Sequence, residues 1–283
     1  YIYRSPSTNL DEPIAKKISD YCNENDIKNV AEVGGNNGVF AHKTISLALG
    51  IENYVIYDQV PLEVHSHILS QKNEFLSSTT ENYAVDLVIA RHAFAHNNSI
   101  SLFAKNIVEK FSPKHIYVEC ADWDLTQKNR DFGQLYSEHF YCLSPLSVSK
   151  LFKSFGYGVV EVNNFNIHNG SFGLLLCKSC KNEIQYQANP KFLIDNEITR
   201  WMSSVHETWN KANKLPIIIW GASAKVVFTI NALDLSRGNI KAIHDSTASK
   251  FGLYPPGLDV KVSAEPKEDI DHGSYSIIVG AKN

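Results

Sequence analysis

The 283-residue sequence lacks several features that would assign a protein to a class at once. No apolar run approaches the roughly 18–20 residues of a membrane-spanning helix, so we expect no membrane partner. Basic residues are not in excess, because the formal net charge is −3, and a protein that coats nucleic acid needs a basic surface. Five cysteines do not make a disulfide framework in a chain this long, which favours a reducing, cytoplasmic location.

The composition is that of an ordinary globular protein, with 43% hydrophobic and 20% charged residues. Short apolar runs alternate with segments of helical periodicity, which predicts an α/β fold around a mostly parallel sheet. A polar stretch at residues 181–189 interrupts this pattern, which then starts again. We therefore predict a Rossmann-like domain over residues 1–185 and a smaller Rossmann-like α/β domain over residues 186–283, the latter truncated at its C-terminus.

A glycine-rich turn, Glu32-Val-Gly-Gly-Asn-Asn-Gly38, separates a predicted strand at 29–33 from a predicted helix at 39–49. Its glycines allow a tight turn and a close approach of a ligand, which then faces the helix N-terminus. The next strand ends at Asp58, and a carboxylate there can accept hydrogen bonds from both hydroxyls of a ribose. The spacing lacks the third glycine of a dinucleotide fingerprint and is typical of S-adenosylmethionine methyltransferases. A plain turn in another α/β protein is the alternative.

Further segments follow the order of motifs of one enzyme family. They are Tyr1-Ile-Tyr-Arg-Ser5, Ala90-Arg-His-Ala-Phe-Ala-His96, Tyr136-Ser-Glu-His139, Ile167-His-Asn-Gly-Ser171, Trp220-Gly-Ala-Ser-Ala-Lys225, and a stretch with Asp245, Lys250, Gly252, Pro256 and Gly257. Together with the glycine-rich turn, these segments resemble the sugar C-methyltransferases that act on nucleotide-linked keto-deoxysugars. The resemblance covers nearly the whole chain, and Tyr-x-Glu-His is its most specific motif.

The resemblance implies a class I methyltransferase fold for residues 1–185, with S-adenosylmethionine as the cofactor and S-adenosylhomocysteine as the product. It implies that the domain at 186–283 helps to hold the nucleotide diphosphate of the substrate. The alternative for that domain is a Rossmann-like module that only supports the first. The implied cofactor contacts are Glu32, Gly34, Gly35, Asn36, Gly38, Asp58 and Arg91.

Methylation at a carbon next to a ketone needs a base and a means of stabilising the resulting enolate. A histidine titrates near neutral pH, and a neighbouring carboxylate can orient it. The resemblance assigns the base role to His139, with Glu138 and Tyr136 beside the keto sugar. His96 ends another strand, and by topology it faces the same crevice. The alternatives are a buried structural histidine at His139 and an ordinary surface turn at His96.

Substrate contacts are implied for Tyr1, Tyr3, His168, Ser171 and Lys225. Lys225 stands one turn into a predicted helix that follows a strand and a tight turn, where backbone N–H groups and an ammonium suit a phosphate. We therefore expect Lys225 to contact the diphosphate. The expected partner is a small nucleotide sugar, with no nucleic acid, and the protein is expected to be a monomer or a weak dimer.

The chain departs from the family at several points. The family begins with a zinc-binding domain built on paired Cys-x-x-Cys motifs, which this sequence lacks; if the natural protein has one, it lies upstream of Tyr1. Asn169 replaces a glycine of the family, and Gly173 replaces an arginine. That arginine is a candidate substrate or structural contact, so its loss leaves the identity of the sugar open.

The sequence contains no convincing metal site. His92 and His96 have the i, i+4 spacing of metal ligands, but a third ligand is not evident. The single Cys177-x-x-Cys180 pair cannot complete a tetrahedral zinc site. We therefore expect no bound metal.

Two other functions remain open at this stage. An O- or N-methyltransferase acting on a related sugar or precursor also needs a base, which His139 would provide. A non-catalytic binding protein that keeps only the shape of the cofactor turn is the third possibility. The joint presence of Tyr136, Glu138 and His139 argues against it.

Overall fold

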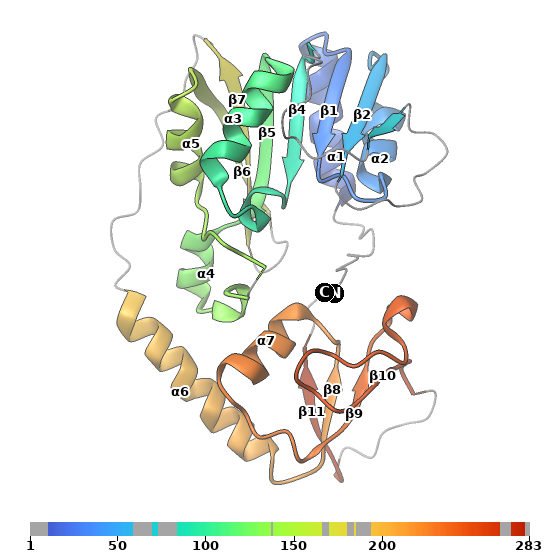
Figure 1. The fold of residues 1–283 in the computed structure, drawn as a ribbon, viewed down its shortest axis with the longest axis vertical. Coiled ribbons are helices and arrows are strands. Elements are labelled where there is room, and N and C mark those ends of the chain that lie inside the picture. The colour runs from blue at the N-terminus through green and yellow to red at the C-terminus, as the bar shows by residue number, and fades with distance from the viewer. Residues whose placement is uncertain are drawn as a thin grey trace. The chain divides into compact units, whose positions relative to one another are not determined.

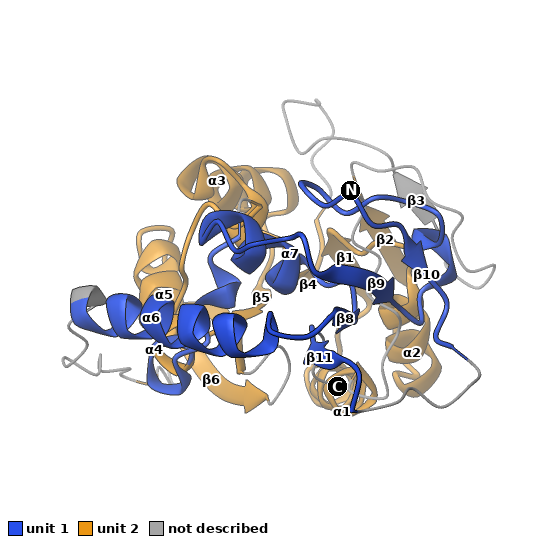
Figure 2. Cartoon of the chain, turned by 90° about the horizontal axis from the view of Figure 1, so that it is seen from below, with its two compact units in different colours: residues 1–6, 126–137, 191–283 blue, residues 7–125, 138–190 orange. Residues whose placement is uncertain are grey.

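The computed structural model describes residues 11–58, 70–72, 84–136, 138–165, 170–179, 184, 194–266 and 273–280. The chain divides into two compact units, which Figure 2 shows in different colours. We call residues 7–125 and 138–190 the large unit, and residues 1–6, 126–137 and 191–283 the small unit. The sequence suggested two continuous domains, and nothing in it indicated that residues 126–137 group with the C-terminal part of the chain.

The large unit is built on a seven-stranded sheet with the order β3-β2-β1-β4-β5-β7-β6. All neighbouring pairs are parallel except β5–β7 and β6–β7, which are antiparallel. The predicted α/β fold with a mostly parallel sheet is thereby confirmed. Its strands are β1 (Asn29–Val33), β2 (Asn53–Tyr57), β3 (Ser70–Lys72), β4 (Leu87–Arg91), β5 (His115–Ala121), β6 (Tyr157–Phe165) and β7 (Ser171–Lys178).

Helices cover both faces of this sheet (Figure 1), which is why its central strands read as continuous apolar runs. The helices α1 (Asp11–Glu24) and α2 (Val39–Leu47) pack on one face, and α3 (Ile100–Phe111) and α5 (Pro145–Lys153) pack on the other. The apolar side chains of α1 recur at helical spacing, so they bury one stripe of the helix against the sheet. The chain also forms two short 3₁₀ turns, η1 (Phe94–His96) and η2 (Phe132–Gln134), and the helix α4 (Trp123–Asn129); η2 belongs to the small unit.

The small unit contains a four-stranded parallel sheet with the order β10-β9-β8-β11. A long helix, α6, precedes its first strand, and α7 connects β8 to β9. Trp209 anchors α6 in the core, where its indole N–H donates to the carbonyl of Ser236 at 3.0 Å. The elements are α6 (Ile194–Ala212), β8 (Ile217–Trp220), α7 (Ala224–Ala232), β9 (Ile240–His244), η3 (Ala248–Lys250), β10 (Val262–Ser263) and β11 (Ser276–Val279).

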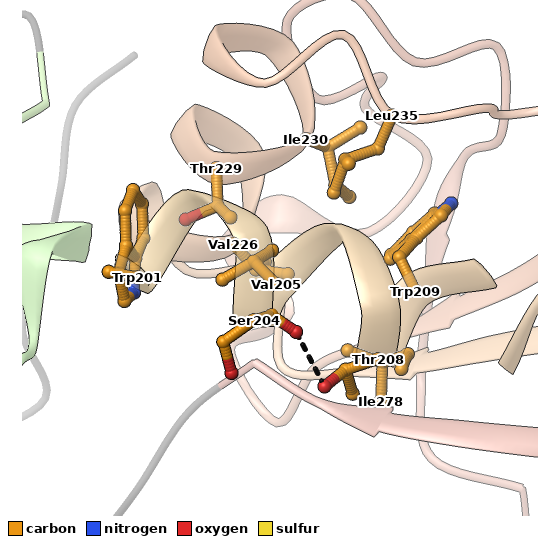
Figure 3. A pocket seen from close by; sticks show the side chains of 10 residues that line it. All are labelled: Trp201, Ser204, Val205, Thr208, Trp209, Val226, Thr229, Ile230, Leu235 and Ile278. Atoms are coloured by element: carbon orange, nitrogen blue, oxygen red, sulfur yellow. Dashed lines mark hydrogen bonds between the residues drawn. The ribbon is translucent and has the colours of Figure 1, made fainter. Parts of the chain in front are cut away.

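A pocket of about 310 Å³ lies inside the small unit, among side chains of α6, α7 and β11 (Figure 3). Its walls are mainly apolar, and Trp201 and Trp209 belong to them. The Thr208 hydroxyl in its wall donates to the carbonyl of Ser204 at 2.8 Å. None of the helices in the described part of the chain is long and apolar enough to cross a membrane.

Candidate active site

The candidate site lies in the large unit at the carboxyl ends of β1, β2 and β4. The chain order of the strands reverses between β1 and β4, and ligands of open parallel sheets bind in the crevice outside such a reversal. Three predicted segments meet this edge: the glycine-rich turn follows β1, Asp58 follows β2, and η1 follows β4.

Three glycines of the turn are required by its geometry. Gly34 and Gly38 have φ angles of 76° and 77°, a left-handed conformation that side chains with a Cβ disfavour. Gly35 has no room for a side chain, because a Cβ there would stand 2.8 Å from Cγ2 of Ile56. Gly38 also forms the N-cap of α2. The turn therefore places bare backbone in front of a helix N-terminus.

Asp58 closes the turn from the neighbouring strand. Its Oδ2 accepts a hydrogen bond of 2.8 Å from the backbone N–H of Asn36, which itself has a φ of 52°. Asp58 is half-buried. It therefore both fixes the turn and stays within reach of a ligand in the crevice.

Glu32 lies beneath the turn. Only 2% of its surface is exposed, and its Oε2 accepts a hydrogen bond of 2.9 Å from the Tyr54 hydroxyl. Burial raises the pKa of Glu32 to about 7, although Arg91 and the Tyr54 hydroxyl act to lower it. Its Cδ would be 3.0 Å from a Cβ at Gly35. Glu32, one of the expected cofactor contacts, thus supports the turn from below.

Arg91, another expected cofactor contact, is held by two carboxylates of the large unit. Its Nε donates to Oε2 of Glu119 at 2.7 Å, and its Nη2 donates to Oδ1 of Asp11 at 2.8 Å. Glu119 is fully buried; burial would raise its pKa, but Arg91 and His92 bring the pKa to about 2. The guanidinium also lies 3.9 Å from the centre of the Phe40 ring. These contacts fasten α1 to β4 and β5.

The structure brings two of the expected catalytic residues together. The rings of His96 and His139 lie 4.8 Å apart, centre to centre, at an angle of 65°. The loop that carries His139 is joined to η1 by a hydrogen bond of 2.8 Å from the Phe140 N–H to the Ala95 carbonyl. Burial lowers the pKa of His96, while the neighbouring Glu138 acts to raise it. At neutral pH the imidazole of His96 is therefore mainly uncharged.

The residue before η1 lies close to the glycine-rich turn. A Cβ at Gly34 would stand 3.1 Å from the Cβ of Ala93, and Ala93 immediately precedes η1. His92 instead faces the buried carboxylate of Glu119, with its Nε2 3.0 Å from Oε1 of that residue. No group of three possible metal ligands occurs among the residues that the structure describes.

The Tyr-x-Glu-His motif is divided between the two units. Tyr136 belongs to the small unit, and Glu138 and His139 belong to the large unit. Three expected substrate contacts, Tyr1, Tyr3 and His168, lie outside the described residues, as does Ser137.

Two residues near the start of β7 bear on the expected substrate contacts. Ser171 is fully buried there. A side chain at Gly173 would collide with the Tyr117 hydroxyl, and its Cβ would be 2.8 Å from the Phe165 ring. The arginine of the family therefore has no place at this position.

Lys225, the expected diphosphate contact, has a partner of its own unit. Its Nζ lies 2.6 Å from Oδ2 of Asp131, and the two side chains are 26% and 21% exposed. Sequence reasoning missed Asp131, because nothing local marks it. It also missed Glu119, although an acidic residue inside an apolar strand run is a usable signal, since such a group is seldom buried without a partner.

No protein-family model matches the sequence, and no curated protein matches it. Among solved structures, the small RNA methyltransferase HEN1 is 12% identical at a TM-score of 0.49, over 66% of this chain and 28% of that chain. Magnesium protoporphyrin IX methyltransferase from Synechocystis PCC 6803 with bound SAH is 13% identical at a TM-score of 0.46, over 63% of this chain and 90% of that chain. N-methyltransferase NodS from Bradyrhizobium japonicum WM9 is 13% identical at a TM-score of 0.46, over 61% and 99% of the two chains. The large unit has a Rossmann-like α/β fold, with helices between the strands of a mostly parallel sheet.

Proposed function

We propose that the protein is an S-adenosylmethionine-dependent methyltransferase that methylates a carbon atom of a nucleotide-linked keto-deoxysugar. Two observations carry this proposal: the turn after β1 requires glycine, and the rings of His96, after β4, and His139, in the loop before α5, lie 4.8 Å apart. When bound, the cofactor supplies an electrophilic methyl group and leaves as S-adenosylhomocysteine. The Tyr-x-Glu-His motif is what directs the proposal to a keto sugar.

The residues around the turn fit such a cofactor. The crowding at Gly34 and Gly35 keeps their backbone bare, so a ligand can approach it closely. The N-terminus of α2 follows at Val39, and the N–H groups of a helix start suit the carboxylate of an amino-acid group. Asp58, half-buried at the end of β2, suits the ribose hydroxyls.

His139 is the proposed base. It takes the proton from the carbon next to the ketone, and the electron pair of the broken C–H bond forms the enolate. A bound cofactor would supply the methyl group that the enolate carbon takes up, and S-adenosylhomocysteine would be the leaving group. His96 is mainly uncharged at neutral pH, so its ring N–H is suited to donate to the enolate oxygen. Glu138 is suited to stabilise the protonated form of His139.

Methyl transfer to oxygen or nitrogen of a related sugar or natural-product precursor is the second candidate. Gly173 favours it, because the side chains of Tyr117 and Phe165 fill the space where the family's arginine would begin. The arginine of the sugar C-methyltransferases, a candidate substrate or structural contact, is therefore missing from this chain. Such a transfer needs a base but no enolate.

Deuterium exchange separates the two candidates. The protein is incubated in D₂O with S-adenosylhomocysteine and a panel of nucleotide-linked keto-deoxysugars, and the sugars are analysed by mass spectrometry. We expect one substrate to gain deuterium next to its ketone with the wild type and none with His139→Asn. Methyl transfer without exchange would establish O- or N-methylation instead. Absence of S-adenosylhomocysteine binding in calorimetry would refute both.

A further inference from the structure

His92 lies at the junction between β4 and η1, and its backbone conformation is unusual. It directly follows the last residue of β4, and η1 begins two residues later. Its φ angle is 49°, in the left-handed region that is uncommon for residues with a Cβ. Such a conformation persists where the surrounding structure holds it. The contacts of His92 therefore decide how the chain turns from the sheet into η1.

Glu119 of the neighbouring strand β5 holds both the backbone and the side chain of His92. The N–H of His92 donates to the carbonyl of Glu119 at 2.7 Å. The ring Nε2 of His92 lies 3.0 Å from Oε1 of the same residue. Two contacts to one residue fix the backbone and the ring of His92 together, so this residue cannot turn without breaking one of them.

The carboxylate of Glu119 is itself held from its other side by Arg91. The Nε of Arg91 donates to Oε2 at 2.7 Å, and its Nη2 donates to Oε1 at 3.3 Å. Hydrogen bonds between charged groups in this forked geometry are short and directional. Because Glu119 is fully buried, no solvent competes for its oxygens. The carboxylate is therefore a fixed point for two successive residues, Arg91 and His92.

The segment after His92 is anchored along its whole length. Phe94 is fully buried and meets a phenylalanine ring of α3 edge to face at 4.8 Å between centres. The N–H of Asn97 donates to the carbonyl of Phe94 at 3.3 Å, and its side-chain amide donates to the carbonyl of Ala93 at 2.9 Å. These bonds leave η1 little freedom of its own, so the direction of the chain at His92 sets the place of His96.

The loop that carries His139 depends on the same segment. The N–H of Phe140 donates to the carbonyl of Ala95 in η1 at 2.8 Å. The rings of His96 and His139 lie 4.8 Å apart, centre to centre. A rotation of η1 would therefore move His96 and would break the bond that holds the loop of His139 beside it.

We infer that Glu119 and His92 are positioning residues: the buried carboxylate holds the left-handed turn at His92, and this turn sets His96 beside His139. All four residues belong to the large unit. For its kinetic consequence, this inference rests on the proposed methyl transfer. The role assigned to Glu119 and His92 requires no contact of either side chain with substrate or cofactor.

Steady-state kinetics of two substitutions at one position test this inference. His92→Ala loses the ring contact to Glu119 but keeps a Cβ, which disfavours the left-handed conformation. His92→Gly loses the same ring, but glycine adopts that conformation readily. A misplaced catalytic group costs up to about 100-fold in rate, so we expect His92→Ala to lower kcat by about 10- to 100-fold with little change in KM. His92→Gly should recover most of the rate.

The two variants together separate positioning from other roles of the imidazole. An equally low kcat in both, or an equal rise of KM in both, would make the imidazole itself a contact of the reacting molecules and overturn the inference. Wild-type kcat in His92→Ala would also overturn it, because the turn would then form without the contact to Glu119.

The matched control is Ser112→Ala. Ser112 has the same kind of backbone conformation, with a φ of 43°, but it is exposed and ends α3 before the amino end of β5. The substitution places an alanine in a left-handed turn away from the two histidines, so it should leave kcat and KM unchanged. A comparable loss of kcat in Ser112→Ala would show that loss of stability, and not positioning, explains the effect of His92→Ala.

The variant Glu119→Gln tests the other partner. It should lower kcat by about tenfold in the wild-type background. In the His92→Gly background the further loss should be about threefold or less, because the glycine no longer depends on the carboxylate and the two changes are not additive. Equal losses in both backgrounds would overturn the role of Glu119. If this buried substitution prevents folding, the pair of variants at His92 decides the inference.

Hydrogen exchange followed by NMR provides a readout that needs no substrate. In His92→Ala, the amides of Asn97 and Phe140 should exchange faster than in the wild type, whereas in His92→Gly their exchange should stay close to that of the wild type. Amides of β1 should keep their protection in both. Unchanged exchange of Asn97 and Phe140 in His92→Ala would overturn the inference. Faster exchange in a protein that methylates no sugar would support the positioning role and refute the proposed function alone.

Discussion

Both units contain the same local arrangement of a turn and a carboxylate, but the carboxylate is buried to a different extent in each. In each, a carboxylate after the second strand accepts a hydrogen bond of 2.8 Å from a backbone N–H of the turn after the first strand: Asp58 from Asn36, and Asp245 from Ala222. Asp245 is buried and is also paired with Lys250 at 2.8 Å, whereas Asp58 is half-buried. A strand, a glycine turn, a helix and a second strand ending in aspartate therefore do not suffice to identify a ligand site.

Burial distinguishes the two turns. The Lys250 ammonium also donates to the carbonyl of Ala222 at 3.2 Å, so Asp245 and Lys250 together close the turn of the small unit from inside. Burial alone would raise the pKa of Asp245, but Lys250 and the Thr247 backbone hold it below its usual range. Asp245 thus has a structural role, and we expect chemistry only at the large unit.

The largest effect expected from this comparison concerns His139 in the large unit. His139→Asn should lower kcat by about 10² to 10⁴, because a positioned base contributes that much to a proton transfer. Its affinity for S-adenosylhomocysteine should be unchanged, because the base acts on the proton that is transferred in the transition state and not on ground-state binding. Methyl-transfer assays and calorimetry measure the two quantities.

Two neighbouring variants check this assignment. Glu138→Gln should cost less than His139→Asn and should shift the pH–rate profile, because the base loses a partner that favours its protonated form. His96→Asn should be intermediate if the ring touches the enolate oxygen. A nearly normal turnover in His139→Asn, combined with loss of activity in His96→Asn, would make His96 the base and His139 the donor to the enolate oxygen.

The second effect is a pH dependence of opposite sign in the two turns. The pKa of Glu32 is raised by burial from 4.5 to about 7, so the folded large unit binds a proton that the unfolded chain releases between these values. Its contribution to stability is complete below about pH 4.5 and is lost as pH rises through about 7. Asp245, whose pKa is lowered, contributes above pH 3.8, and this contribution is lost as the pH falls further.

The variant Glu32→Gln tests the direction of the pH dependence that Glu32 gives to stability. Glutamine does not titrate, so at pH 8 the variant should be more stable than the wild type by up to about 3 kcal/mol, and near pH 4.5 the two should be alike. Urea unfolding at a series of pH values gives both free energies. Equal pH slopes in the two proteins would show that Glu32 keeps a normal pKa.

The third effect separates structure from ligand binding in the small unit. Asp245→Asn removes the charge opposite Lys250 and leaves a mostly buried ammonium without its carboxylate. Hydrogen bonds to charged groups contribute about 1.5–3 kcal/mol, so we expect a loss of about 2 kcal/mol in unfolding free energy. S-adenosylhomocysteine affinity should not change. Weaker cofactor binding in this variant would contradict the structural role of Asp245.

Much of the fold follows from local pattern, because buried parallel strands are continuous apolar runs and the elements between them have helical periodicity. β3 and β10, with three and two residues, are too short to leave such a pattern. The glycines of the first turn were predicted from backbone chemistry alone. His96 was placed at this edge by topology and His139 by the resemblance, and in the structure their rings lie 4.8 Å apart.

The contacts that the sequence could not predict are long-range pairings. Lys225 and Asp131 are 94 positions apart, and no local signal shows that a lysine at a helix start already has a carboxylate. Arg91 was expected at the cofactor from the resemblance alone, and no local signal indicated its partners Glu119 and Asp11, which come from β5 and α1. Which charges are paired depends on the packing of the finished fold.

The smallest effect is at Asp58, the counterpart of Asp245. Asp58→Asn keeps an acceptor for the Asn36 N–H but loses the charge and one acceptor for the ribose. We expect S-adenosylhomocysteine to bind about 1–2 kcal/mol more weakly, or roughly 5- to 30-fold, with almost no change in stability. Asp58→Ala, which also loses the bond to Asn36, should weaken binding further. Calorimetry on these variants and on Asp245→Asn compares the two turns directly. If Asp58→Asn lost stability and kept its affinity, the two carboxylates would have the same structural role, and the cofactor would have to bind by the turn and helix N-terminus alone.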